Sequence, residues 1–152
     1  TTYKHGDANA LTKYNLSSSY GTVDNKTTLD PEDDAARFHM GGDWRMPTRA
    51  EFQELLDNTV SEWIEDFNGS GVNGRKFTGS NGKYIFIPAS GYRSVSSFYN
   101  QGSFGYIWSS SLNTAYTTCA WRMFFGPSSI NAGTSFDYRV YRYYGYSVRG
   151  VL

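Results

Sequence analysis

The order of local signals along the chain predicts an α+β fold whose sheet is mostly antiparallel. Two helix signals lie before residue 59, and short aromatic and β-branched segments separated by turn residues follow from residue 72 onward. No tandem repeat with a period of about 20 to 50 residues is present. We expect a single domain over residues 1–152, trimmed at its N-terminus because the chain begins with Thr1.

The first helix signal is a run of helix-start residues at Asp30. Asp30 is an N-cap residue type, Pro31 suits the first helical turn, and the acids at 32–34 favour the positive end of the helix dipole. We therefore predict a helix over 31–40 that ends at Gly41. The same acids could form a carboxylate cluster for calcium binding or acid catalysis, but helix-start chemistry explains them better.

The second helix signal is stronger because it combines a cap with an apolar face. Thr48 and Glu51 have the spacing of a capping box, in which each side chain bonds the backbone of the other. Three apolar residues recur on one helical face at i, i+3 and i+4 from Phe52. This pattern predicts a helix that ends near Asn58.

Strand signals dominate the rest of the chain. Residues 72–77 and 84–87 flank a turn at 80–82, which predicts a hairpin closed by Pro88. Later strands are expected between loops rich in serine, glycine and asparagine, at 105–109, 119–125, 135–141 and 146–151. The polar first thirty residues indicate loops and short edge pairing.

Tyrosine is concentrated in the C-terminal part of the chain. Nine of the thirteen tyrosines follow Gly91, in a stretch without lysine or glutamate. Tyrosine offers a rigid contact area with a hydroxyl at its tip, as in antibody loops, and serine, glycine and asparagine add adaptable hydrogen bonds. A recognition surface is therefore one interpretation. Half-buried strand tyrosines are an alternative of equal weight, because tyrosine also has high β-propensity.

Charge is balanced over the whole chain but not along it. Residues 1–83 carry nine Lys and Arg against thirteen Asp and Glu, whereas residues 84–152 carry five Arg against Asp137 alone. Arginine beside aromatic residues suits either single-stranded nucleic acid or a protein partner. Because no lysine is present there to neutralise phosphates, we expect a protein or glycan ligand and no nucleic acid. No apolar run approaches the ~20 residues of a membrane span.

No pattern in the sequence indicates catalysis, a cofactor or a metal site. His5 and His39 lack a carboxylate or cysteine at a recognisable ligand spacing. Cys119 is the one cysteine, and its sequence neighbours include no base that could activate a nucleophile. The sixteen glycines match no phosphate-binding loop. We therefore expect a protein that is not an enzyme and uses no cofactor.

The segment GGDWRMPTRAEFQELLDN, residues 41–58, resembles the W-R-M/L-P-T-x-x-E-F/W element that opens a core helix in bacterial C-type-lectin-like domains. That group includes the formylglycine-generating-enzyme type and paralogous surface domains of gut bacteria. IFIPASGYR (85–93), GYIWSSSLN (105–113) and GYSVRGV (145–151) are similar to later landmarks of the family. The resemblance implies a C-type lectin-like fold, with two helices packed on a mostly antiparallel twisted sheet and long irregular loops.

The resemblance also implies roles for individual residues. Trp44 and Phe52 would fill the core, Arg45 would pair with buried polar groups and Thr48 would cap the helix. Formylglycine generation in that family uses a copper-binding cysteine pair, which a chain with Cys119 alone cannot assemble. A calcium-dependent sugar site of the animal lectin kind is not expected either, because the Glu-Pro-Asn style motif is absent.

Residues 105–151 resemble, more narrowly, the variable region of proteins diversified by retroelements, in which asparagine-type codons are randomised within a C-type-lectin scaffold. The anchors of such regions are present as WSSSLNT (108–114) and SVR (147–149), with Gly150 where the family usually has proline. Randomising the first two bases of an asparagine codon never gives Lys, Glu, Gln, Met or Trp. The resemblance therefore implies a variable region over about 105–147, in which Trp121 and Met123 are fixed scaffold.

The leading hypothesis is a ligand-binding, receptor-recognition protein of the bacterial cell surface, the extracellular space or a phage virion. Its expected ligand contacts are Tyr116, Thr118, Arg122, Phe124, Ser129, Asn131, Ser135, Tyr138, Tyr141, Arg142, Tyr143, Tyr144 and Tyr146. The alternative is a non-diversified structural or adhesive bacterial surface domain of the same fold. Solvent-facing tyrosines on one face would favour the first hypothesis, and buried tyrosines the second.

Overall fold

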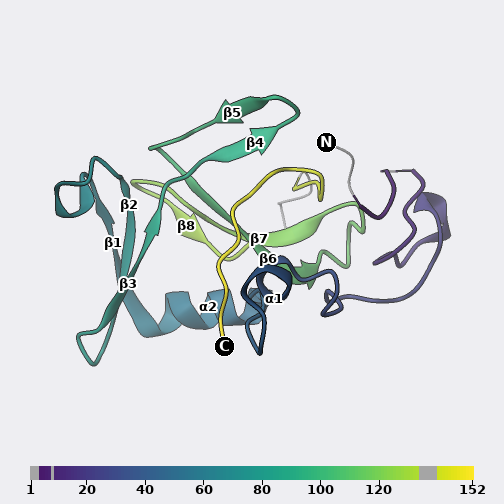
Figure 1. The fold of residues 1–152 in the computed structure, drawn as a ribbon, viewed down its shortest axis with the longest axis horizontal. Coiled ribbons are helices and arrows are strands. Elements are labelled where there is room, and N and C mark those ends of the chain that lie inside the picture. The colour runs from purple at the N-terminus through teal and green to yellow at the C-terminus, as the bar shows by residue number, and fades with distance from the viewer. Residues whose placement is uncertain (1–3, 8, 134–139) are drawn as a thin grey trace.

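The computed structural model describes residues 4–7, 9–133 and 140–152 (Figure 1). In this part of the chain two α-helices, α1 (Ala35–Met40) and α2 (Arg49–Asn58), precede eight strands. Every strand pairing is antiparallel, so the predicted α+β class is confirmed. None of the described helices has the length and apolar character needed to cross a membrane.

The strands form three sheets that follow one another along the chain. They are β1 (Thr59–Ile64), β2 (Gly74–Gly79), β3 (Tyr84–Pro88), β4 (Tyr92–Ser94), β5 (Ser97–Tyr99), β6 (Gly105–Leu112), β7 (Ala120–Phe125) and β8 (Ile130–Asn131). The sheet orders are β1-β2-β3, β4-β5 and β6-β7-β8. In the view of Figure 1, α2 lies below the sheets and the β4–β5 hairpin lies above them.

The first predicted helix begins four residues late, because Asp34 and not Asp30 caps it. The Asp34 carboxylate accepts hydrogen bonds from the backbone N–H groups of Ala36 and Arg37 at 2.9 and 3.1 Å, and from that of Met46 at 2.8 Å. The Asp30 carboxylate instead pairs with lysine side chains. The predicted start at residue 31 is therefore wrong, since residues 31–33 form a turn.

The second predicted helix is confirmed together with its capping box. The Glu51 N–H donates to the Thr48 hydroxyl at 3.2 Å, and the Thr48 N–H donates to the Glu51 carboxylate at 2.8 Å. Arg45 does not pair with buried polar groups as expected. Its guanidinium forms a two-pronged, half-exposed ion pair with Glu51, which holds the pKa of that carboxyl at about 2.

The hairpin predicted between residues 72 and 87 is present as β2 and β3. The Gly79 N–H donates to the Lys83 carbonyl at 2.9 Å and closes the turn. Strand β1 continues directly from α2, with no turn residue between them to signal it. The prediction also missed β4, β5 and β8, which are two or three residues long and too short for an alternation pattern to stand out.

The predicted strand at 146–151 is wrong. Ser147 bridges Ile107 and Val151 bridges Arg45, so this segment passes from one neighbour to another and never follows a single strand. Of the strand predicted at 135–141, residues 135–139 lie outside the described part of the chain. Tyr141 makes an isolated antiparallel bridge to Cys119.

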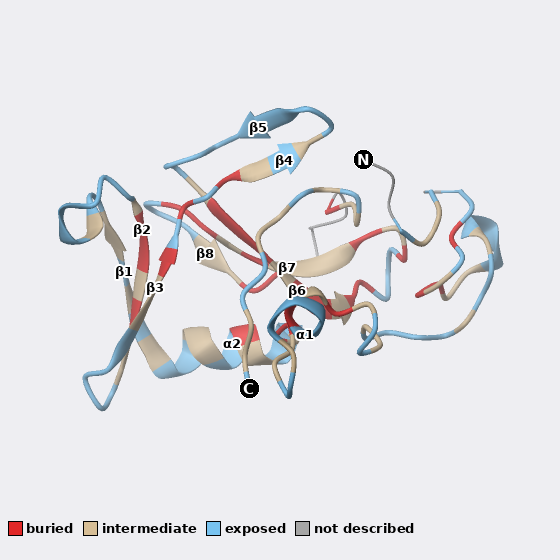
Figure 2. Cartoon of the chain, viewed as in Figure 1, coloured by how far each residue is buried: buried red, intermediate tan, exposed pale blue. Residues whose placement is uncertain are grey.

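The hydrophobic core lies between α2 and the first and third sheets (Figure 2). Its fully buried members are Phe52, Phe77, Ile87, Ala89, Ile107, Met123, Phe125 and Ala132. The expected core role of Phe52 is thus confirmed.

Trp44 is half-buried outside this cluster and lies against Gly150, where an added Cβ would approach the Trp44 ring to 3.0 Å and Met40 Sδ to 2.7 Å.

The packing of β6 against β7 predicts that Gly105→Ala is destabilising. A Cβ on Gly105 would lie 2.0 Å from Cζ of Phe125, which is fully buried, so the ring must move. We expect the free energy of unfolding, measured in urea, to fall by about 1–3 kcal/mol. Gly79→Ala is the matched control, because its Cβ would first meet a flexible Asn81 side-chain oxygen at 3.3 Å. Equal losses in the two variants would contradict this packing.

Candidate functional site

The C-terminal segment, residues 140–152 and yellow in Figure 1, lies beside the strands that carry the predicted site. Gly145 exchanges two backbone hydrogen bonds with Arg93 of β4, at 3.0 and 2.8 Å. The Ser147 carbonyl accepts from the Trp108 N–H at 2.9 Å, and the Ser147 N–H donates to the Tyr106 carbonyl at 3.1 Å. These bonds fix the segment to both β4 and β6.

Seven tyrosines meet between hairpin β4–β5, strand β6 and the C-terminal segment, and we call them the tyrosine cluster. Its members are Tyr92, Tyr99, Tyr106, Tyr141, Tyr143, Tyr144 and Tyr146. Contacting rings have centroids 5.0 to 6.0 Å apart, in stacked or edge-on arrangements. Aromatic pairs favour this geometry, so the rings form one connected unit.

The inner end of the tyrosine cluster is packed into the protein. The Tyr146 ring stacks on Tyr106 at 5.1 Å, on Tyr144 at 5.6 Å, and lies 4.5 Å from the Trp108 ring. Burial raises the pKa of the Tyr146, Tyr144 and Tyr106 phenols. These groups are therefore neutral hydrogen-bonding groups at physiological pH.

The outer end of the cluster faces solvent. Tyr143 is 46% exposed and stacks on half-buried Tyr141 at 5.2 Å. Tyr99 on β5 is also 46% exposed, beside Phe98 at 62%. A partner can thus reach a face of aromatic rings that the inner tyrosines hold in place.

Two predicted contact residues on β7, Arg122 and Phe124, border the cluster. The Arg122 guanidinium lies 5.5 Å from the Tyr106 ring centroid and 5.0 Å from that of Phe124, within cation–π range. Phe124 stacks in turn on Phe104 at 5.5 Å. Both β7 residues are half-buried, so this part of the surface combines a fixed positive charge with aromatic area.

Arg142 is directed away from the cluster. Its guanidinium donates to the backbone carbonyls of Lys13 and Tyr14, at 3.3 and 3.1 Å. This side chain therefore ties the C-terminal segment to the N-terminal part of the protein.

The remaining predicted contacts lie on other loops. Tyr116 is 46% exposed and Thr118 is half-buried, both between β6 and β7, while Ser129 is exposed and Asn131 half-buried near β8. Ser135 and Tyr138 lie outside the described residues.

The sequence prediction did not include the cluster members on β4, β5 and β6. Tyr92 is the most connected of them, since its ring contacts four other tyrosines. A signal was available, because Tyr92 and Tyr99 lie symmetrically about a short turn and pair directly across the hairpin. The spacing is that of a small hairpin with aromatic residues at one end.

A second polar site lies near the N-terminus, where Asp30, Glu32 and Asp33 place carboxylate oxygens within 4.8 Å of one another. Such a group could hold a cation. However, Lys13 Nζ lies 2.6 Å from Asp30, 3.1 Å from Glu32 and 2.6 Å from Asp33. The Lys13 ammonium already supplies the positive charge, and hydrogen bonds from it to Asp30 and Asp33 raise its pKa. Helix-start chemistry thus accounts for Asp34 but not for the other two predicted acids.

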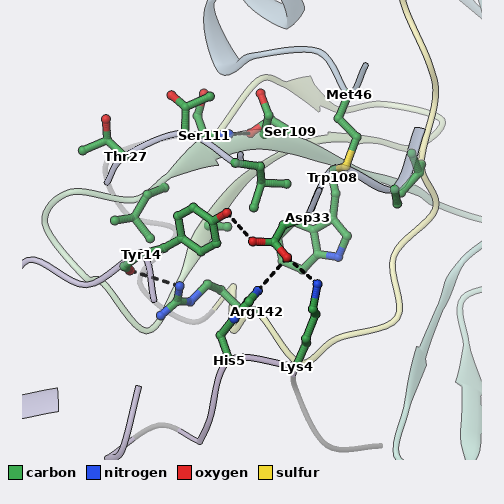
Figure 3. A pocket seen from close by; sticks show the side chains of 17 residues that line it. Lys4, His5, Tyr14, Thr27, Asp33, Met46, Trp108, Ser109, Ser111 and Arg142 are labelled. Carbon is green, nitrogen blue, oxygen red and sulfur yellow. Dashed lines mark hydrogen bonds and ion pairs between the residues drawn. The ribbon is translucent and has the colours of Figure 1, made fainter. Parts of the chain in front are cut away.

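Asp33 is the centre of this ion cluster (Figure 3). Its side chain is 3% exposed, and its oxygens lie 2.5 Å from Lys4 Nζ, 3.1 Å from His5 Nε2 and 2.6 Å from the Tyr14 hydroxyl. Burial alone would raise the pKa of the Asp33 carboxyl. Hydrogen bonds from Lys13, Lys4 and Tyr14 outweigh burial and hold that pKa well below its usual range.

Cys119 is completely buried, and burial raises the pKa of its thiol. A buried thiol of raised pKa is a poor nucleophile, in agreement with the sequence argument against this role.

Comparisons with protein-family models, curated proteins and solved structures gave no match to this chain.

The two ends of the tyrosine cluster predict opposite responses to truncation. Tyr146→Ala removes a ring packed against four others, and we expect a loss of about 3 kcal/mol in the free energy of unfolding. Tyr143→Ala, the matched change in the same segment, removes a ring at the solvent and should cost less than about 1 kcal/mol. Urea unfolding measures both. Similar losses would mean that the cluster has no separate inner and outer ends.

The lowered pKa of Asp33 predicts acid sensitivity. Because the folded pKa lies below that of the unfolded chain, this contribution is present above about pH 4 and is lost as the pH falls through the folded pKa. Asp33→Asn should cost about 2 kcal/mol of unfolding free energy at pH 7, and the difference from wild type should shrink at lower pH. Asp43→Asn, at an exposed acid, is the control. A pH-independent loss at Asp33 would contradict the assignment.

Proposed function

We propose that this chain is a ligand-binding protein with a C-type lectin-like fold, whose C-terminal surface is diversified by a retroelement. The ligand is a protein or glycan on a cell or phage, and the protein acts outside the cell, at the bacterial surface or on a phage virion. The observation that supports this most is the outer end of the tyrosine cluster, where exposed rings stand on packed ones.

A pre-ordered surface gives such a protein an energetic advantage. Ordering a mobile side chain at an interface costs about 0.5–1.5 kcal/mol, and ring stacking between Tyr141 and Tyr143 removes part of that cost before a ligand arrives. The exposed tyrosines, together with Arg122, offer the residue types that dominate binding hot spots. A surface of this kind can supply about 800 Å², one side of a standard interface.

Residues that a randomised asparagine codon cannot encode are packed here, and several that it can encode are exposed. This pattern fits diversification at such codons. Met123 is completely buried, and Trp121 is held between the Arg49 guanidinium at 4.2 Å and the backbone at Gly133. Neither residue type can arise from a randomised asparagine codon. Tyr116 and Tyr143, whose types can arise, are exposed. Cys119, Tyr144 and Tyr146 are exceptions, because their types can also arise although Cys119 is completely buried and the two tyrosines are packed at the inner end of the cluster.

The packed inner end of the cluster favours a second candidate, a structural or adhesive surface domain of the same fold. In that case Tyr106, Tyr144 and Tyr146 stabilise the domain, and the outer rings pack against a neighbouring domain or subunit. The flanking DNA separates the two candidates. Diversification requires a near-identical template repeat that differs at adenines, beside a reverse transcriptase gene, and its absence would leave the second candidate.

Replacing single positions with every residue that a randomised asparagine codon encodes tests which residues are fixed scaffold and which can vary. We expect Tyr116 and Tyr143 to accept nearly all encoded residues, as exposed Val60 should, because their rings lie at the solvent. Trp121 and Met123 should accept few. Protease resistance of the protein displayed on cells, followed by sequencing, measures tolerance. Intolerance at Tyr143 equal to that at Met123 would favour the structural candidate.

A further inference from the structure

A cavity of about 210 Å³ lies apart from the outer tyrosines, between the N-terminal region, the start of α1 and strand β6 (Figure 3). Its apolar wall is formed by Tyr14, Leu29, Met46, Trp108 and Leu112. A cavity of ~150 Å³ holds benzene, and drug-sized ligands need at least ~300 Å³. The available volume therefore fits one aromatic ring with a small substituent.

Tyr14 holds its place in this wall in an uncommon backbone conformation. Its φ is 58°, in the left-handed region, although the residue is bulky and only 2% exposed. The Tyr14 N–H donates to Asp24 at 2.8 Å, and the hydroxyl donates to Asp33 and accepts from the Asp30 N–H. Strained residues fixed by several bonds are frequent at ligand sites, and this one presents its ring to the cavity.

The charged groups of the cavity favour an anion over a cation. Asp33 is the one carboxylate among the described residues that line it, and its oxygens already lie 2.5 to 3.1 Å from Lys4 Nζ, Lys13 Nζ, His5 Nε2 and the Tyr14 hydroxyl. Lys4 has three N–H donors and a side chain that is 66% exposed, and it gives one bond to Asp33. Arg142 adds a fixed positive charge. An amine entering here would meet these cations, and its one possible carboxylate partner among the described lining residues, Asp33, is already paired with Lys4 and Lys13.

We propose that this cavity binds a small aromatic monocarboxylate. The ring occupies the apolar space beside Tyr14 and Trp108, and the carboxylate is oriented toward the Lys4 ammonium. The site is independent of the outer tyrosine surface and goes beyond recognition of a macromolecule.

Titration of the 152-residue chain with benzoate, benzyl alcohol and benzylamine tests the proposal by ¹H–¹⁵N NMR. These probes share one ring and differ in charge. We expect benzoate to give saturable shifts in the amides of Tyr14, Leu29 and 109–112. Its Kd should be about tenfold lower than that of benzyl alcohol, as a charge-assisted hydrogen bond predicts. Benzylamine should bind more weakly than either.

Two variants locate the site. Ala35→Leu places a larger side chain in the cavity from the first turn of α1 and should weaken benzoate at least about tenfold, whereas Ala50→Leu, at an exposed position in the first turn of α2, should leave its Kd unchanged. Lys4→Gln changes an exposed side chain and should remove the preference for benzoate over benzyl alcohol. The proposal would be overturned if benzoate gave no saturable shift up to about 10 mM. That concentration is about ten times a Kd of 1 mM, which corresponds to only a few contacts. Stronger binding of benzylamine, or an unchanged Kd in Ala35→Leu, would also overturn it.

Discussion

The backbone hydrogen bonds at Gly145 and Ser147 are the interaction on which the surface of this protein depends. They join the C-terminal segment to β4 and β6, and each contributes about 0.5–1.5 kcal/mol net. A Cβ on Gly145 would lie 3.1 Å from that of Arg93 and 3.2 Å from its carbonyl oxygen, so a side chain at this position would be tightly packed. Because the backbone is fixed on both sides of Tyr146, the aromatic rings of the segment meet those of the hairpin and of β6.

The tyrosine cluster has both packed and solvent-exposed rings. Tyr146 is held among four other rings, whereas Tyr143 stacks on Tyr141 and leaves nearly half of its surface to solvent. The tyrosine-rich region therefore contains both packed and solvent-exposed rings. A stable inner layer also lets the outer layer vary, since truncation at the solvent removes little buried area.

The excess of acids in the N-terminal part of the chain is partly neutralised by lysines of that same part. The acids near residue 30 pair with Lys4, Lys13 and Lys26 of the same N-terminal part, and not with the C-terminal arginines that the structure describes. Arg93 and Arg122 instead lie over aromatic rings, where positive charge borders the tyrosine cluster. Arg142 is one of the links between the two regions, because it donates to backbone carbonyls beside the cavity.

Local sequence determined the α+β class, the capping box of α2 and the β2–β3 hairpin, because the residues that form them are close together in the chain. It also indicated a tyrosine-rich region, and it pointed to Tyr143 and Arg122 as candidates. Only the tertiary structure decided that Asp34 caps α1, since Lys13 binds Asp30 from an earlier segment of the chain. It alone decided which tyrosines are packed and which are exposed, and it created the cavity. Those features arise from contacts between segments as distant as residues 14 and 142, and no local pattern encodes such pairings.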